Sequence, residues 1–300
     1  TLARELGVSR TAIWKAVSSL REMGFLITSA AGGGYCLDES SDALSEAGIS
    51  MNLTTRYAAQ HLCVLSTVDS TNNYLKQRAA DLPHGYAVVA DCQTAGRGRL
   101  GRSFVSPSGS GIYISLLLRP NIPLERMHLM TVGAAIAACE AIQETAGFTP
   151  DIKWVNDVLM HGKKLCGILT EASIEAETGQ LSYVIVGIGL NVRTPAGGLA
   201  PEIADIAGCL EDFAPHAVRR NALAASFFNH MESCCDLIAA GQTDALIDRY
   251  RSFIHFLGQP ITVIRFDKRE PATAVGIDSN GHLIIEQNGQ RSTLVAGEIS

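Results

Sequence analysis

Hydrophobic residues near the start of the chain recur every three or four positions, which is the spacing of one face of an α-helix. They predict a helix over residues 10–23, with Ser9 placed to cap its first turn. A short helix is expected before it, at 1–7, and two strands after it, at 25–28 and 35–37. This order is typical of a winged helix-turn-helix, and a plain helical hairpin is the alternative.

Polar residues cover the outer side of the second helix, and this end of the chain is basic. Residues 1–35 carry a net charge of +2, which leaves −8 for the rest of a chain whose total is −6. A basic end on an acidic body is typical of a DNA-reading module joined to a metabolic domain, although a chance imbalance would give the same numbers. The wing at 32–34 would meet the DNA backbone, and we expect the first helix of such a domain to be missing before Thr1. The residues expected to face the major groove are Arg10, Thr11, Trp14, Lys15 and Ser18.

Short apolar, β-branched runs then alternate with helical patterns, which predicts a mixed α/β domain. A polar stretch at 39–50 is expected to be the linker that precedes it. The predicted strands lie at 64–68, 86–91, 112–118, 151–159, 165–171 and 183–191. The predicted helices lie at 73–80, 127–147, 218–240 and 245–256.

From residue 258 the pattern changes to short strands separated by turns, which predicts a small β-barrel. The chain is therefore predicted to be an α+β multidomain protein. The strands of the barrel are expected at 261–266, 272–277, 282–286 and 291–295. The predicted parts are a winged helix-turn-helix at 1–38, the linker at 39–50, a central domain at 51–257 and the barrel at 258–300.

Composition narrows the class of protein. The 300 residues are 47% hydrophobic and 18% charged, which suits packed cores and argues against disorder. No apolar run approaches the length of a membrane-spanning helix, and no secretory signal begins the chain. The eight cysteines follow no metal-binding spacing. We therefore expect a cytoplasmic protein without a membrane partner or a structural metal.

One stretch of the central domain carries the clearest chemistry. Three glycines and three arginines alternate over residues 96–102, which we call the Gly/Arg loop. Glycines let a backbone fold tightly around a ligand, and guanidinium groups pair with phosphate or carboxylate. Because strands are predicted on both sides, the loop favours a compact anion as its ligand. A disordered RNA-binding segment and a plain turn are the alternatives.

Two further stretches of the central domain carry candidate polar groups. Lys153 stands among apolar residues at 151–159, and an unpaired buried charge is expensive. This lysine therefore either extends to solvent or points into a polar site. The small polar residues at 69–72 either cap the next helix or bind a polar head group at its N-terminus.

The usual glycine signatures of nucleotide binding are not met. The segment 187–189 lacks the third glycine and the following helix of a Rossmann fingerprint, and 162–164 lacks the Walker Ser/Thr and first glycine. If the protein uses ATP, it binds the nucleotide by another architecture.

The order and spacing of these motifs resemble those of bacterial bifunctional biotin–protein ligases that also repress the biotin operon. The resemblance covers nearly the whole chain, and the Gly/Arg loop followed by the segment 153–157 is its most specific part. The family usually has Pro where Val155 stands, and Trp is common where Phe104 stands. The other matching pieces are 69–72, Gln93, 164–169 and 187–191.

The resemblance implies a central domain of the class II synthetase-like type and an SH3-like barrel. It implies that biotin and MgATP condense to biotinyl-5′-AMP, and that a lysine of a biotin carboxyl carrier protein then displaces AMP. Lys153 is the expected central cation, with Arg99 as the second catalytic residue, and Asp157 is a candidate for Mg²⁺. The implied biotin-binding residues are Ser70, Thr71, Asn72, Gln93, Arg97, Gly98, Arg99, Lys153 and Gly167. The implied ATP and adenylate residues are Arg97, Arg99, Arg102, Lys153, Asn156 and Asn191.

The same resemblance implies regulation as well as catalysis. The bound adenylate is expected to promote a homodimer that reads biotin operon DNA. A transcription factor that senses a small acid without ligating it, and a lipoate or octanoate ligase, are the alternatives. Exchange between ATP and diphosphate that depends on biotin would distinguish them.

Overall fold

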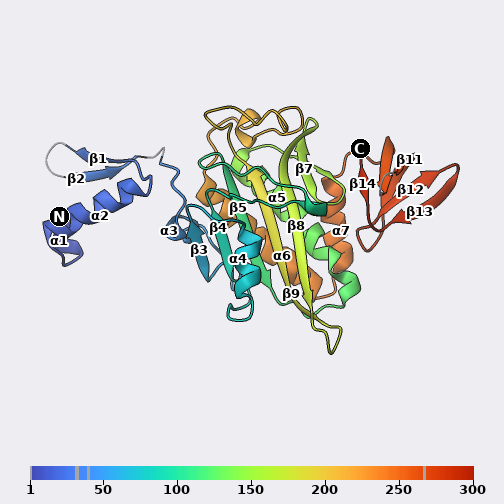
Figure 1. The fold of residues 1–300 in the computed structure, drawn as a ribbon, viewed down its shortest axis with the longest axis horizontal. Coiled ribbons are helices and arrows are strands. Elements are labelled where there is room, and N and C mark those ends of the chain that lie inside the picture. The colour runs from blue at the N-terminus through green and yellow to red at the C-terminus, as the bar shows by residue number, and fades with distance from the viewer. Residues whose placement is uncertain (1, 31–33, 39–40, 266–267) are drawn as a thin grey trace. The chain divides into compact units, whose positions relative to one another are not determined.

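The structure, a computed structural model, divides into two units, Thr1–Ser45 and Glu46–Ser300. Both are drawn in Figure 1, and each is described by itself. The residues that the structure describes are 2–30, 34–38, 41–265 and 268–300.

The first unit is a helix-turn-helix followed by a two-stranded hairpin. The longer helix begins after Ser9, whose Oγ accepts the backbone N–H of Ala12 at 3.1 Å. Ile13 and Val17 are its buried residues, as the periodicity predicted. The predicted helices and paired strands are confirmed, whereas wing residues 32 and 33 lie outside the described residues. The elements are α1 (Leu2–Glu5), α2 (Arg10–Glu22), β1 (Ile27–Ala30) and β2 (Gly34–Leu37).

The second unit contains a seven-stranded mixed sheet in the order β3-β4-β5-β9-β8-β7-β6. β3 and β4 are parallel, and the other neighbours are antiparallel. Every residue of β5 is buried, because helices cover both faces of the sheet. The strands are β3 (Leu62–Leu65), β4 (Ala87–Ala90), β5 (Gly111–Leu118), β6 (Asp151–Lys153), β7 (Asp157–Met160), β8 (Lys163–Ile174) and β9 (Leu181–Asn191).

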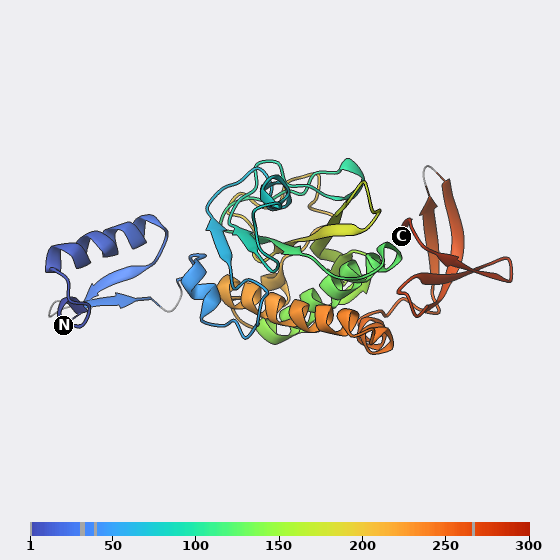
Figure 2. The same cartoon turned by 90° about the horizontal axis from the view of Figure 1, so that it is seen from below.

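Helices α5 and α6 pack on one face of this sheet and α4 on the other, as Figure 2 shows. The small residues of α5 permit close packing: a Cβ built at Gly133 would lie 3.1 Å from the Cβ of Cys234 on α6. The helices are α3 (Glu46–Ser50), α4 (Thr71–Arg78), α5 (His128–Ala146), α6 (Arg220–Ala239) and α7 (Thr243–Ser252). Short 3-10 turns occur at Arg99–Gly101, Leu124–Arg126 and Leu210–Asp212.

A five-stranded antiparallel sheet follows α7, in the order β13-β12-β11-β10-β14. It confirms the predicted C-terminal β domain. The indole N–H of Trp154 donates to the carbonyl oxygen of Gly281 at 3.1 Å and joins this domain to the central one. Its strands are β10 (Pro260–Arg265), β11 (Lys268–Ile277), β12 (Leu283–Gln287), β13 (Gln290–Leu294) and β14 (Glu298–Ile299).

Two predictions about local structure differ from what is observed. The end of the expected linker is helical, because Ile49 of α3 is fully buried in the second unit; residues 39 and 40 lie outside the described residues. The expected strand at 151–159 is a hairpin, in which β6 turns back on β7 and Lys153 lies opposite Asp157. Among the described residues, no helix has the length and apolar character needed to cross a bilayer.

Candidate active site

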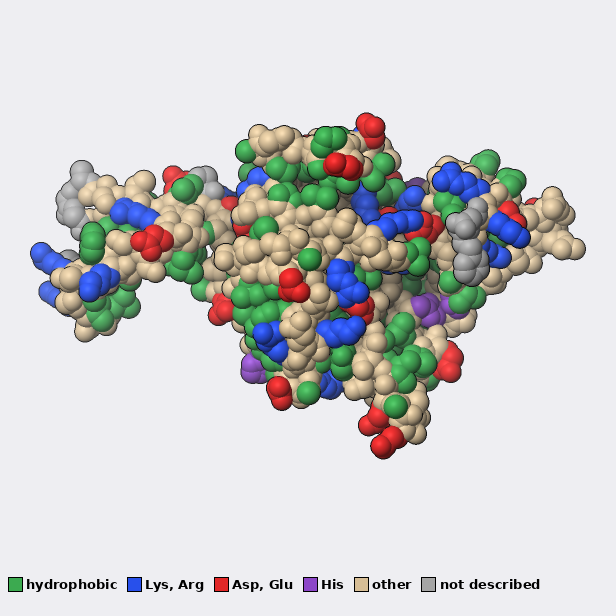
Figure 3. Space-filling view, in the orientation of Figure 1, with side chains coloured by type: hydrophobic (Ala, Val, Ile, Leu, Met, Phe, Trp, Pro, Cys, Tyr) green, Lys and Arg blue, Asp and Glu red, His purple; other side chains and the backbone are tan. Residues whose placement is uncertain are grey.

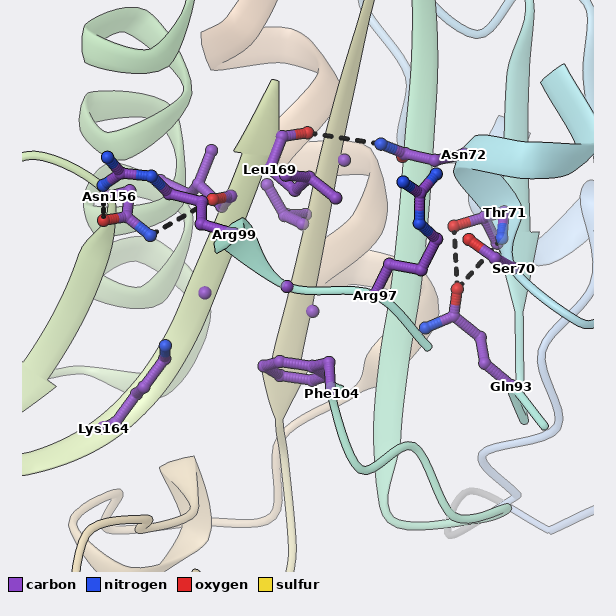
Figure 4. A pocket seen from close by; sticks show the side chains of 16 residues that line it. Ser70, Thr71, Asn72, Gln93, Arg97, Arg99, Phe104, Asn156, Lys164 and Leu169 are labelled. Atoms are coloured by element: carbon purple, nitrogen blue, oxygen red, sulfur yellow. Dashed lines mark hydrogen bonds between the residues drawn. The ribbon is translucent and has the colours of Figure 1, made fainter. Parts of the chain in front are cut away.

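A cavity opens on the face of the central sheet that carries α4 (Figure 4). It lies between the N-terminus of α4, the Gly/Arg loop and strands β8 and β9, and Lys and Arg side chains gather on the same face (Figure 3). The predicted site residues that line this first cavity are Ser70, Thr71, Asn72, Gln93, Arg97, Gly98, Arg99, Asn156 and Gly167. The lining residues that were not predicted are Phe104, Lys164, Ile168, Leu169, Gly187, Ile188 and Gly189.

Glycines form the floor of the first cavity. A Cβ built at Gly189 would lie 2.4 Å from the ring of Phe104, and one at Gly187 would lie 2.2 Å from Asn72 Oδ1. Real Cβ atoms do not approach other atoms so closely, so both positions exclude a side chain. The Phe104 ring is held edge-on against Tyr113, with ring centroids 6.3 Å apart. The floor is therefore bare backbone with an aromatic ring beside it, a surface that suits a compact ring system.

A hydrogen-bonded network forms the polar wall at the start of α4. Gln93 Oε1 accepts the backbone N–H of Thr71 at 2.9 Å, and so caps the helix in place of the small residues before it. The hydroxyl of Ser115 lies 2.7 Å from Thr71 Oγ1 and donates to Asn72 Oδ1 at 2.5 Å. Ser70 makes no capping bond, and no described residue hydrogen-bonds its hydroxyl. The network fixes the wall and leaves the Ser70 hydroxyl for a ligand.

Arg97 stands at the rim of the cavity and is tied to Glu171. Its Nη1 donates to Glu171 Oε1 at 3.1 Å and to Asn73 Oδ1 at 2.9 Å. Glu171 also accepts from the Asn72 side chain at 2.9 Å. One carboxylate on β8 therefore orients both the polar wall and the first arginine of the loop, although sequence reasoning did not single it out.

The other two loop arginines diverge. Arg99 donates to Asn156 Oδ1 at 2.6 Å and lines the first cavity. Arg102 forms a two-armed ion pair with Glu298 of β14, at 2.8 and 3.0 Å, and does not line the cavity. In this structure a carboxylate almost 200 positions away in the sequence holds the Arg102 side chain, and its expected contact with the ligand stays a prediction.

Lys164 supplies the ammonium group of the first cavity. Its Nζ lies 2.7 Å from Asp157 Oδ1, and the same oxygen accepts from the Asn156 side chain at 3.1 Å. The neighbouring Arg99 bonds to Asn156, so two cations and a single carboxylate meet at this end of the cavity. An anionic ligand would be favoured there.

A β-bulge turns Lys164 toward the cavity. Val158 pairs with Cys166 but the next residue, Leu159, pairs with Lys164, so that Leu165 is an extra residue in β8. Strict alternation would place Lys164 on the opposite face from Gly167, and the bulge places both on the same face. A Cβ at Gly167 would lie 3.1 Å from Lys164 Cε.

Lys153 is not among the residues that line the first cavity, and its role as the central cation stays a prediction. It ends β6, the edge strand, two strands beyond the strand of Gly167. Neighbouring strands are roughly 5 Å apart, so its backbone lies roughly 10 Å farther out. The hairpin turn at 154–156, absent from the predicted single strand, produces this displacement. Lys164 belongs to the matched segment 164–169, so the sequence did indicate this stretch. Regular alternation along a strand, however, would direct its side chain away from the face of Gly167 and out of the cavity.

The remaining candidate for the nucleotide lies in another cavity. Asn191 lines a third cavity with the loop at 195–201, and its Nδ2 donates to the carbonyl oxygens of Lys164 and Gly208 at 3.3 and 3.2 Å.

The candidate ligand for Mg²⁺, Asp157, forms an ion pair with Lys164. In the described part of the chain, no three His, Cys, Asp or Glu side chains are grouped to hold a metal ion.

The predicted DNA-facing residues lie on the outer side of α2. Arg10, Thr11, Trp14 and Lys15 are exposed, whereas Ser18 is half-buried. The buried residues Ile13 and Val17 lie on the opposite side of the helix. The arrangement leaves the polar side of α2 free to contact a partner.

The fold and the cavity define the class to which the chain belongs. Residues 64–191 match the biotin/lipoate A/B protein ligase family, residues 1–36 match an HTH domain, and residues 256–300 match the biotin protein ligase C-terminal domain. The structure resembles the biotin protein ligase from Aquifex aeolicus in complex with biotin and ATP, with a TM-score of 0.70 and 27% identity. The match covers 80% of this chain and 98% of that one.

Relatives that combine both activities match over greater lengths. The bifunctional ligase/repressor BirA of Bacillus subtilis is 38% identical, over 94% of this chain and 87% of the relative. The Escherichia coli protein of the same name is 30% identical, over 100% of this chain and 91% of the relative. The chain belongs to this family of bifunctional biotin–protein ligases and repressors.

Proposed function

We propose that the first cavity joins the carboxylate of biotin to the α-phosphate of ATP, and that the adenylate then passes biotin to a lysine of a biotin carboxyl carrier protein. Negative charge accumulates at the carboxylate–phosphate centre in both steps. A fixed set of cations and hydrogen-bond donors is the catalyst that such chemistry needs. The observation that carries the proposal is the meeting of Lys164 and Arg99 at one end of a cavity whose floor is bare glycine.

The glycine floor and the polar wall would hold the ring system of biotin. Its ureido group both donates and accepts hydrogen bonds, which matches the free hydroxyl of Ser70 and the ordered side chains of Thr71, Asn72 and Gln93. Gly98 and Gly167 would leave room for the acyl chain, which runs toward Lys164. Arg97 would exchange its bond to Glu171 for one to the ligand.

Lys164 would bridge the biotin carboxylate and the α-phosphate from inside the first cavity, and Lys153 is the alternative cation that the family resemblance implies. The carboxylate attacks phosphorus, the bond from the α-phosphorus to the bridging oxygen breaks, and diphosphate leaves with the electron pair. Asp157 holds the ammonium group extended toward Asn156 and Arg99, which preorganises the positive charge. The acceptor amine later attacks the acyl carbon, and AMP leaves.

Asn191 would recognise the adenine base. Its Nδ2 already donates to two carbonyl oxygens, and its Oδ1 has no partner among the described residues. The exocyclic amine of adenine is a donor that suits this oxygen. Mg²⁺ would arrive with the ATP phosphates and keep several water ligands, with Asp157 as its protein ligand, and no structural metal is needed.

The finer architecture and regulation follow the same proposal. We infer a class II synthetase-like central domain, an SH3-like C-terminal barrel, and a homodimer promoted by bound adenylate. The dimer would read biotin operon DNA in the cytoplasm through the residues of α2 (Arg10, Thr11, Trp14, Lys15 and Ser18). The match of residues 1–36 to an HTH domain and the exposure of the first four of these side chains support this.

Isotope exchange tests the proposed catalytic step. Radiolabelled diphosphate should enter ATP only when biotin is present, because the adenylate forms reversibly. Lipoate and octanoate should support less than about one hundredth of the rate, if the polar wall reads the ureido group. Exchange that is independent of biotin, or equal with the three acids, would refute the proposal.

A further inference from the structure

A second cavity, of about 170 Å³, adjoins the first and lies outside the site proposed for biotin. It shares Arg99, Asn156 and Ile168 with the first cavity, so the two are contiguous. Its far wall is the C-terminal barrel, which contributes His282, and a third side is the start of α5, which contributes His128. A product that leaves the carboxylate–phosphate centre on this side enters a space bounded by the first cavity, the barrel and the start of α5.

The lining of the second cavity is cationic. Arg99 donates one of its five N–H groups to Asn156. The rings of His128 and His282 are stacked, with centroids 4.5 Å apart and planes 23° apart. None of the described residues that line this cavity is acidic. The cavity therefore suits an anion and disfavours an ammonium group such as that of an acceptor lysine.

The hydrogen bonds of His128 connect the start of α5 to the barrel. Nδ1 faces the carbonyl oxygen of Glu125 at 3.0 Å, and Nε2 faces the carbonyl oxygen of Asn280 in the barrel. Both partners are acceptors, and a neutral imidazole has a single N–H to donate. Both bonds therefore form together only in the charged ring, which then holds the barrel against α5.

His282 is the second ring of the stacked histidine pair. Its Nδ1 lies 3.2 Å from Asp278 Oδ2, which leaves Nε2 as the free end of the ring. Burial acts to raise the pKa of Asp278, but the backbone N–H groups of His282 and Asn280 outweigh it and lower that pKa, so Asp278 remains a carboxylate. An anion in the cavity could accept a hydrogen bond from Nε2 of His282, since Nδ1 already faces Asp278.

We propose that the second cavity receives the diphosphate that leaves in the adenylation step, with Arg99 and Nε2 of His282 as donors and His128 holding the barrel wall in place. The titratable and charged groups that bear on the pair are Arg99, Asp278 and the two histidines themselves. The inference rests on the proposed function, since it assigns a place to the product of that reaction.

The test measures biotin-dependent exchange between diphosphate and ATP in the full-length chain. His282→Gln should raise the KM for diphosphate about tenfold, as expected for the loss of one charge-assisted hydrogen bond. The KM for biotin should stay within about twofold. His128→Gln should raise the same KM, because the barrel wall that carries His282 is then held less firmly.

His255→Gln is the matched control, because His255 also bonds to a carboxylate, Asp151, but lines none of the three cavities. It should leave the diphosphate KM unchanged. The inference would be overturned if folded His282→Gln kept the parent's KM for diphosphate, or if the KM values for biotin and diphosphate rose equally. Either result would leave the proposed function standing, because the exchange reaction would still occur. Absence of exchange in the parent chain would instead overturn the proposed function.

Discussion

Two lysines, on strands separated by β7, provide a direct test of which side chain supplies the central cation. Lys164 lines the first cavity 2.7 Å from Asp157, whereas Lys153 stands on the edge strand and does not line it. Replacement of Lys164 by Gln removes the ammonium group and retains most of the side-chain volume. Loss of one preorganised electrostatic donor costs about 10²–10³ in rate, which is about 3–4 kcal/mol of transition-state stabilisation. Lys153→Gln should change the rate less than about threefold.

The assay is single-turnover formation of biotinyl-5′-AMP with saturating biotin and MgATP. Removal of Lys164 also leaves Asp157 without its ion-pair partner, so the double variant Lys164→Gln/Asp157→Asn removes both charges. It should recover thermal stability relative to the single variant, and its rate should stay low because both the ammonium group and the proposed Mg²⁺ ligand are lost. A slow Lys153→Gln variant beside a normal Lys164→Gln variant would refute the assignment. Recovery of the rate in the double variant would refute it as well.

Three further outcomes follow from particular contacts. Gly189→Ala should weaken biotin binding by at least about tenfold in calorimetry while the chain still folds, because its Cβ displaces the Phe104 ring; unchanged affinity would contradict the glycine floor. The Gly/Arg loop should resist limited proteolysis better with biotin and ATP than without them, and equal cleavage would count against ligand contacts from its arginines. The bond to Glu140 raises the pKa of His230, so this contact stabilises the fold fully at about pH 5.5 and progressively less as pH rises through the raised value. His230→Gln should therefore lower the unfolding free energy at about pH 5.5 and change it little at about pH 9, and an equal loss at both pH values would exclude this linkage.

Local signals were sufficient for much of the fold. The periodicity of Ile13 and Val17 predicted α2, whose observed bounds differ from the prediction by a single residue at one end. The small-residue run predicted α5, and the alternation of glycine and arginine located the loop that lines the first cavity. Each of these elements depends on residues close together in sequence.

The side-chain positions that local patterns did not indicate depend on distant partners or on a break in periodicity. The direction of Lys164 depends on the extra residue Leu165, which no pattern of apolar positions marks. The position of Lys153 depends on a hairpin turn inside an apolar run that has the pattern of one strand. Arg102 is directed by Glu298, from a domain that begins far along the chain. Spacing indicates which residue types gather at a site but not which side chain enters the cavity.

The most direct measurement of the central claim is the yield of biotinyl-5′-AMP when the purified chain is mixed with biotin and MgATP without an acceptor. Mass spectrometry of the extracted ligands should find close to one equivalent of adenylate per chain. Under the same conditions, a single turnover of Lys164→Gln should be about 10²–10³ times slower. Binding of biotin and ATP with no adenylate formed would contradict the account and favour a sensor that does not ligate its ligand.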